Sequence, residues 1–193
     1  MALILASKEC ELREILLKNK PEEMLEISSK GTVPVLQFTN KVLDESLDII
    51  SWAMESPSPN VHIYTDAEES LSKDLINLFD IKFKHHLDRY KYSSRYGVDP
   101  EDHQEECKVI LENLEDKINP QPWIFGKEVS LLDISILPFI RQCKIANPDW
   151  FFSQSFVKVI DLLNYFENSD LFIRAMQKYE LWDPKKNNGK IFP

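Results

Sequence analysis

The chain changes character once, at Ser56-Pro57-Ser58-Pro59-Asn60, where two prolines and small polar residues follow a helical stretch. Such a composition is typical of a linker, because proline interrupts regular elements while serine and asparagine favour turns. The segment separates a short N-terminal part of the 193-residue chain from a longer C-terminal part. We therefore expect two domains, over residues 1–55 and 61–193.

The first part has the pattern of a small mixed α/β domain. Short apolar runs predict strands, a proline at a first helical turn opens one helix, and a hairpin-length connection joins two of the strands. The strands are expected at Glu11–Leu17, Val33–Phe38 and Lys41–Leu43, and the helices at Pro21–Ile27 and Asp44–Met54.

The second part has the period of α-helices almost throughout. Helices are expected at Glu68–Lys84, Pro100–Ile118, Ser130–Ile145 and Phe156–Tyr179, the last with a break near Asn168. Ser130 and Asp133 form a capping-box pattern at the start of a helix that is apolar on nearly every face. This helix is expected at the centre of an all-α domain.

Composition excludes several function classes. The formal net charge is −9, with 32 acidic and 23 basic side chains, so the basic stripe that nucleic acid requires is absent. The four glycines lie too far apart for a Gly-rich phosphate loop. No apolar run approaches about 18 residues, so no membrane span is expected. Three cysteines without metal-ligand spacing predict a cytoplasmic protein with no metal site.

A candidate binding edge lies at Val33-Pro34. Proline at the start of a strand gives no N–H to the sheet and leaves the backbone of the preceding residue free. The N–H and C=O of Val33 could then bind an extended, peptide-like ligand. Glu45 and Ser46 open the next helix, where backbone N–H groups favour a carboxylate. Together they predict a site for a small peptide with an anionic end; a plain edge strand and a plain helix cap are the simpler alternatives.

The order and spacing of several motifs resemble the glutathione transferase superfamily over essentially the whole chain. The omega-like, cysteine-type bacterial branch is the most similar. The resemblance rests on Lys18–Met24, Lys30–Leu36 and Asp44–Ile49, which are similar to the thioredoxin-like domain, on Ser130–Asp133, which is similar to the helical domain, and on Phe83-Lys84, Leu87–Tyr92 and Arg95-Tyr96, which are similar to that branch.

The resemblance implies a thioredoxin-like α/β domain, an all-α helical domain, and glutathione as co-substrate. Val33, before a cis Pro34, would hold the cysteinyl part of glutathione. Glu45 and Ser46 would receive the γ-glutamyl end, and Lys20 would face the glycyl carboxylate, although a solvated lysine is an equal alternative. A homodimer is also implied.

Arg89, Tyr90 and Tyr92 would, by the same resemblance, border the site of a second substrate, an electrophile or a disulfide. An interdomain salt-bridge network is the equal alternative. The function implied is conjugation of glutathione to electrophiles or its exchange with disulfides. The alternative is a non-catalytic binding or regulatory module of the same fold.

No catalytic residue is identified. The family uses a Tyr, Ser or Cys at the end of its first strand, and the register of Met1–Lys20 implies that this strand and its catalytic turn lie upstream of Met1. Absence of that central strand would leave an unpaired strand edge on each side of a gap. Cys10 lies at the entry to a strand with no helix behind it that could stabilise a thiolate, so we expect it to be structural.

Overall fold

The structure is a computed structural model that describes residues 1–56 and 60–193. It divides into two compact units, one formed by Met1–Pro59 with Asp170–Pro193 and the other by Asn60–Ser169. Residues 57–59 of the expected linker lie outside the described residues. The C-terminal segment from Asp170 thus belongs with the first unit, whereas the sequence predicts it as part of the helical domain at 61–193.

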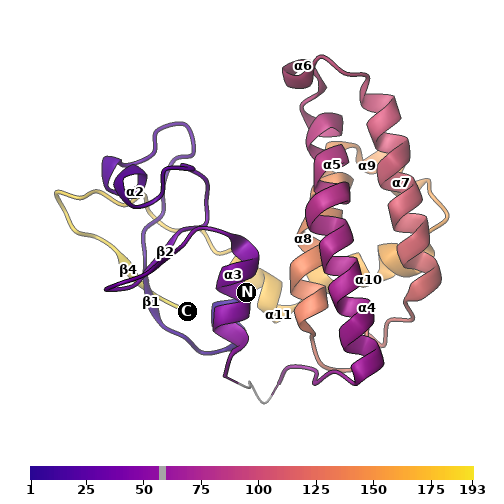
Figure 1. The fold of residues 1–193 in the computed structure, drawn as a ribbon, viewed down its shortest axis with the longest axis horizontal. Coiled ribbons are helices and arrows are strands. Elements are labelled where there is room, and N and C mark those ends of the chain that lie inside the picture. The colour runs from indigo at the N-terminus through magenta and orange to yellow at the C-terminus, as the bar shows by residue number, and fades with distance from the viewer. Residues whose placement is uncertain (57–59) are drawn as a thin grey trace. The chain divides into compact units, whose positions relative to one another are not determined.

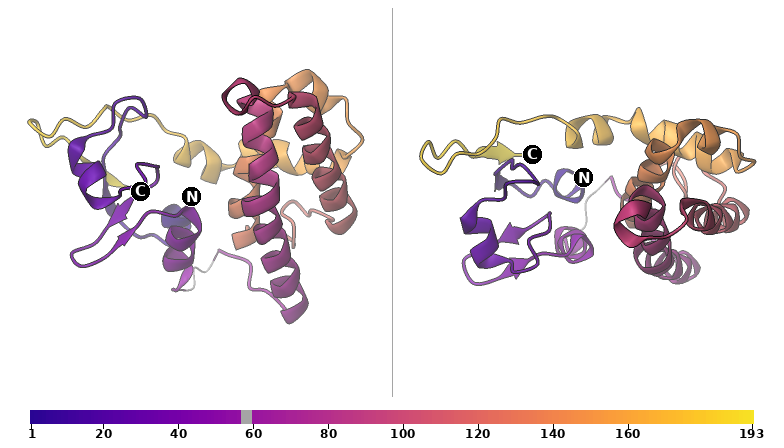
Figure 2. Two further views of the ribbon diagram at one scale, coloured as in Figure 1. Left: turned by 45° about the horizontal axis from the view of Figure 1, so that its top comes forward. Right: turned by 90° about the horizontal axis from the view of Figure 1, so that it is seen from above.

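The first unit combines two strand pairs with short helices (Figure 1). β1 pairs antiparallel with β4, which brings Cys10 opposite Phe192, and β2 pairs antiparallel with β3. Both views in Figure 2 show the C-terminal segment beside the first elements of the chain. The elements are α1 (Ala2–Leu5), β1 (Cys10–Leu12), α2 (Glu22–Ile27), β2 (Leu36–Gln37), β3 (Val42–Leu43), α3 (Ser46–Met54), α11 (Asp170–Ala175) and β4 (Lys190–Phe192).

The strand expected over Glu11–Leu17 is shorter in the structure. Regular pairing ends at Leu12. The C-terminal segment meets the chain again at Glu14, whose C=O accepts the N–H of Trp182 at 2.8 Å, but the neighbouring groups bond locally. The carboxylate of Glu14 accepts the N–H of Ile15 at 3.0 Å, and Asn19 N donates to Leu16 O in a turn. These local bonds use backbone groups that a longer strand would need.

The strand expected over Val33–Phe38 is also shorter, with β2 limited to Leu36–Gln37. Pro34 has no N–H to donate to a sheet, which explains why pairing starts only beyond it. The Val33–Pro34 peptide bond is cis, as the resemblance implies. Phe38 N donates to Lys41 O and closes the hairpin to β3.

The second unit is built from helices, as the sequence predicts. The expected helix Glu68–Lys84 is longer and changes pitch, because a π-helical stretch, η1, joins α4 to α5. The expected helix at 156–179 breaks at Asn168, as predicted, and its second half, α11, ends at Ala175. The elements are α4 (Asp66–Asn77), η1 (Leu78–Phe83), α5 (Lys84–Lys91), α6 (Ser93–Tyr96), α7 (Pro100–Lys117), α8 (Leu131–Ala146), α9 (Pro148–Phe152) and α10 (Val157–Glu167).

The capping box at Ser130 and Asp133 is confirmed. Both side chains are fully buried. Asp133 accepts the N–H of Ser130 at 2.8 Å and the N–H of Ile124 at 3.1 Å, and the Ser130 hydroxyl accepts the N–H of Asp133. The start of α8 is therefore fixed by bonds that also fasten the preceding loop.

The core is distributed unevenly between the units. Most fully buried large side chains belong to the second unit, where α8 contributes Leu132, Ile136, Leu137 and Ile140. In the first unit, many apolar side chains stay half-exposed or exposed. None of the helices over the described residues is both long enough and apolar enough to cross a bilayer.

Candidate functional site

The ammonium group of Lys30 joins two neighbouring carboxylates at the start of α3. Lys30 Nζ lies 2.6 Å from Glu45 Oε1 and 3.1 Å from Asp44 Oδ1. The hydroxyl of the buried Ser28 donates to the other oxygen of Asp44 at 2.9 Å. This network fixes the backbone at the point where the chain enters the helix.

The N-terminus of α3 is not capped by a side chain. Glu45 is the N-cap residue with an extended backbone, and its side chain reaches Lys30 and makes no capping bond. The first-turn N–H groups, beginning with that of Ser46, therefore face outward with the positive end of the helix dipole. The side chain of Glu45 is 55% exposed, so an anion and a cation of one ligand can both be bound here.

Electrostatics keep this network charged near neutral pH. The hydrogen bond from Lys30, with that from Ser28, lowers the pKa of Asp44. Conversely, hydrogen bonds to Glu45 and Asp44 raise the pKa of Lys30. Because these side chains are open to solvent, their ion pairs add little to stability. Their main effect is to hold the loop of Lys30 against the start of α3.

The backbone of Val33, thirteen positions before α3 begins at Ser46, has a free hydrogen-bonding edge. Its side chain is 46% exposed, and within the described residues its N–H and C=O take part in no backbone hydrogen bond. An extended peptide could therefore pair with Val33, as the sequence predicts.

Lys20 is placed near the same loop by the turn at Gly31. Gly31 has a φ of +58°, in the left-handed region, and a Cβ there would lie 3.2 Å from Leu25 Cδ2. The same position is 4.0 Å from Lys20 Cδ. Glycine thus allows the loop of Lys30 to approach the segment that carries Lys20.

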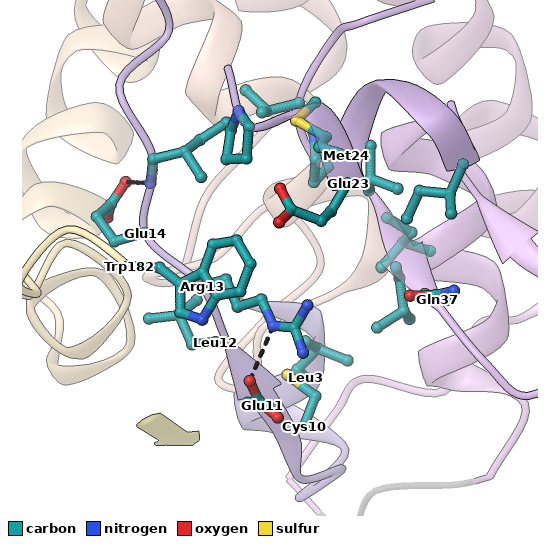
Figure 3. A pocket seen from close by; sticks show the side chains of 18 of the residues that line it. Leu3, Cys10, Glu11, Leu12, Arg13, Glu14, Glu23, Met24, Gln37 and Trp182 are labelled. Carbon is teal, nitrogen blue, oxygen red and sulfur yellow. Dashed lines mark hydrogen bonds and ion pairs between the residues drawn. The ribbon is translucent and has the colours of Figure 1, made fainter. Parts of the chain in front are cut away.

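A groove of about 820 Å³ lies in the first unit beside Val33 and Pro34. Its walls come from β1, α2, β2 and the C-terminal segment. Figure 3 shows Trp182 and Arg13 on one side and Met24 and Glu23 on the other. The groove therefore adjoins the free edge of Val33.

The cysteines are not activated in the way that a thiolate catalyst requires. Cys10 lines the groove, and burial raises the pKa of its thiol. Cys107 and Cys143 are fully buried. Interaction with Cys143, followed by burial, raises the pKa of Cys107. Burial of Cys10 therefore works against the thiolate that a nucleophilic cysteine needs.

Over residues 1–56 and 60–193, no three or more His, Cys, Asp or Glu side chains form a cluster that could hold a metal ion. The histidine pair His85-His86 instead makes contacts to protein groups. His85 interacts with Arg89, and His86 Nδ1 lies 2.8 Å from His103 Nδ1.

The residues expected to border a second substrate lie on or just after α5. The guanidinium of Arg89 stacks over the ring of Tyr96 at 4.6 Å. The hydroxyl of Tyr90 accepts a hydrogen bond from Gln104, whereas the side chain of Tyr92 is exposed. Lys91 Nζ lies 5.1 Å from the centre of the Tyr92 ring, so each of the three side chains has a different partner within the helical unit.

Two parts of this region are not identified from the sequence. Asp44 and Lys30 lie within the motifs quoted for the resemblance, but the ion pairs between Lys30 and the carboxylates of Asp44 and Glu45 are not predicted. The only sequence signal for these ion pairs is that two adjacent acidic residues follow a lysine in the chain. Trp182 contributes to the groove from the distant C-terminal segment, and no local pattern indicates this.

Known proteins are similar to this chain at three levels. A family model described as the N-terminal domain of glutathione S-transferase matches residues 1–60. An Arabidopsis thaliana protein, the chloroplastic glutathione S-transferase DHAR3, is 30% identical over 137 residues, which cover 70% of this chain and 49% of that protein. The Arabidopsis glutathione S-transferase L2 is 28% identical over 89% of this chain and 55% of its own length. The chain thus spans about half the length of these relatives.

Solved structures extend the similarity to the whole fold. The glutathione transferase Omega 3C of Trametes versicolor has a TM-score of 0.72 at 17% identity, covering 93% of this chain and 78% of that chain. A bacterial glutathione transferase, BphK, has a TM-score of 0.72 at 16% identity, and the match covers 91% of this chain and 90% of that chain. The sequence and structural similarities agree with the motifs and with the cis bond at Val33–Pro34. This chain belongs to the glutathione S-transferase superfamily.

Proposed function

We propose that the protein binds glutathione in the first unit and transfers it to an electrophile or exchanges it with a disulfide. The observation that carries the proposal is the combination of a free Val33 backbone edge with an uncapped α3 N-terminus that bears Glu45. Glutathione is a tripeptide with a backbone to pair with, an ammonium group and two carboxylates. The site offers a partner for each of these groups.

Each proposed contact follows from charge and hydrogen-bonding capacity. Val33 would pair with the cysteinyl backbone next to Pro34. The γ-glutamyl carboxylate would accept from the backbone N–H and hydroxyl of Ser46, while its ammonium group would donate to Glu45. Lys20 would neutralise the glycyl carboxylate.

The second substrate and the assembly form a further part of the proposal. Arg89, Tyr90 and Tyr92 combine positive charge with amphipathic rings, which suits an apolar electrophile that carries a polar group. A homodimer is proposed by analogy with the family. Sedimentation velocity of the purified chain tests this point, because a monomer at micromolar concentration would contradict it.

Turnover tests the proposed reaction. The purified chain is mixed with glutathione and either an activated aryl halide or a small disulfide, and product is followed against the rate without protein. We expect glutathione-dependent turnover with one of the two substrates. Rates equal to the uncatalysed reaction with both, in a protein that retains glutathione, would favour the non-catalytic alternative.

A further inference from the structure

The side chain of Asn188 holds the turn that precedes β4 in the C-terminal segment. Its Oδ1 accepts the N–H of Asp183 at 2.7 Å, and its Nδ2 donates to the C=O of Leu181 at 3.1 Å. Trp182, between these two residues, donates its own N–H to the C=O of Glu14 at 2.8 Å. The amide of Asn188 therefore fixes the segment at the point where it meets the N-terminal part of the first unit.

An amide at position 188 can make both bonds, whereas a carboxylate cannot. Asp183 offers a donor and Leu181 an acceptor, so the side chain between them must present an acceptor and a donor together. A carboxylate would keep the bond from the N–H of Asp183, but it would place a second acceptor against the C=O of Leu181. Conversion of Asn188 to an acid would therefore break one bond and add repulsion between two oxygens.

Asn188 is followed by Gly189, and this is the one Asn–Gly pair in the sequence. Glycine has no side chain to shield its backbone nitrogen, so this nitrogen can reach the side-chain carbonyl carbon of the preceding asparagine. Within residues 1–56 and 60–193, the N–H of Gly189 forms no hydrogen bond that would hold it back. At Asn168-Ser169, in contrast, the N–H of Ser169 donates to Phe166 O at 3.1 Å. Asn188 is thus the asparagine whose neighbour is best placed to attack it.

The reaction of such a pair is intramolecular and needs only water. The backbone nitrogen of Gly189 loses its proton and attacks Cγ of Asn188, the Cγ–Nδ2 bond breaks, and Nδ2 takes up a proton and leaves as ammonia. Water then opens the five-membered cyclic imide at either of its two carbonyl groups. One product is aspartate, with the main chain unchanged. The other is isoaspartate, in which the main chain runs through the former side chain and is one carbon longer.

The start of β4 has no room for a longer main chain. Lys190 lies opposite Leu12 and Ile191 opposite Glu11 in the pairing with β1. A Cβ at Gly189 would lie 2.6 Å from Cγ of Glu11, so the glycine passes this side chain in close contact. An extra carbon directly before Gly189 would therefore push the glycine against Glu11 or shift β4 out of register with β1.

We propose that Asn188-Gly189 is a deamidation site, and that its conversion to aspartate or isoaspartate releases β4 from β1. Two hydrogen bonds hold the amide of Asn188 in the turn, so the attack by Gly189 proceeds when the turn opens locally. The reaction is therefore slower in the folded protein than in the unfolded chain. This proposal does not depend on glutathione binding, and its test contains no glutathione.

The first experiment follows the reaction in the wild-type protein. The purified chain is incubated in mildly alkaline buffer, both folded and in concentrated guanidinium chloride. Peptide mass spectrometry detects the replacement of –NH2 by –OH at each asparagine, and an isoaspartyl methyltransferase detects isoaspartate. In the folded protein we expect Asn188 to convert before every other asparagine. In the denaturant its conversion should be at least about tenfold faster, because the turn no longer holds the amide.

Two variants that make the same chemical change in one turn provide a matched comparison. Asn188→Asp is the aspartate product itself. Asn187→Asp changes the preceding amide, whose side chain makes no hydrogen bond in the described part of the chain, and aspartate tolerates the φ of +46° at this position.

Hydrogen exchange measured by mass spectrometry reports on β4 in both variants and in the aged wild-type protein. We expect Asn188→Asp to speed exchange in β4 severalfold and Asn187→Asp to match fresh wild type. Aged protein that contains isoaspartate should exchange faster still. Unchanged exchange in the helical unit confirms that each protein is folded.

Three results would overturn the proposal. The first is an Asn188 that stays intact in the folded protein throughout an incubation many times longer than its conversion takes in the denaturant. The second is conversion of another asparagine, such as Asn168, as fast as that of Asn188 in the folded protein. The third is unchanged exchange in β4 both for Asn188→Asp and for the aged protein.

Discussion

Lys30 donates to Glu45 Oε1 across 2.6 Å, although fifteen residues separate them in the chain. Because of this bond, the Glu45 side chain does not cap α3, and the first-turn N–H groups stay available. Lys30 also holds Asp44, so one cation positions both carboxylates. The loop of Lys30 and the start of α3 therefore form one unit of the proposed site.

Removal of Lys30 should change the titration of Asp44. In the wild-type protein the bond from Lys30 lowers the pKa of Asp44. We expect Lys30→Met to raise this pKa toward the ordinary value of an aspartate, as measured by NMR of the carboxyl carbon. Lys41→Met, which removes a lysine from the nearby hairpin, should leave it unchanged. An unaltered Asp44 titration in Lys30→Met would refute the network.

The buried capping box should dominate the stability of α8. Asp133→Ala removes the acceptor of two backbone N–H groups and one hydroxyl in a buried setting. We expect a loss of about 3 kcal/mol in the free energy of unfolding, measured with urea. Glu68→Ala alters the solvent-exposed capping box of α4 and should cost far less. Equal losses would contradict the role of burial.

Glu115 should stabilise the start of α10 from a different helix. Its two carboxylate oxygens accept the N–H groups of Lys158 and Val159 at 3.0 and 2.9 Å. Since α10 has no side-chain cap of its own, Glu115→Ala should lower stability by about 2 kcal/mol. Glu112→Ala on the same helix should change it by less than about 0.5 kcal/mol. Urea denaturation of both variants checks the difference.

Burial of His86 should make stability depend on pH. Burial lowers the pKa of His86; Glu106 opposes this effect, while the charges of His103, His85 and Lys82 add to it. Because the folded pKa lies below the unfolded value of about 6.5, the unfolded state binds more protons. Stability from this group is complete above that value and is lost as pH falls through the folded pKa.

His86→Asn should therefore reduce the loss of stability between pH 7.5 and pH 5 relative to wild type. Urea denaturation across this range measures the loss. The same pH dependence in both proteins would show that His86 does not cause it.

Local patterns predicted the parts of this structure that depend on neighbours in the chain. The capping box of Ser130 and Asp133 spans one helical turn, and the Val33–Pro34 edge depends on proline itself. In contrast, β4 pairs with β1 across nearly the whole chain, so no local pattern reveals it. The expected strand at Glu11–Leu17 ends early because Glu14 and Leu16 form local bonds. The bond from Lys30 to Glu45 and the position of Trp182 in the groove wall likewise join residues that are apart in the chain, so no local pattern predicts them.

Glutathione binding by calorimetry tests the central claim most directly. The purified chain, Glu45→Ala and Glu55→Ala are titrated with glutathione. Glu55 follows the other end of α3 and serves as a matched control. We expect wild type and Glu55→Ala to bind equally, and Glu45→Ala to bind at least about tenfold more weakly, because a charge-assisted bond is lost. Equal binding by all three proteins, or no binding by wild type at millimolar glutathione, would contradict the account.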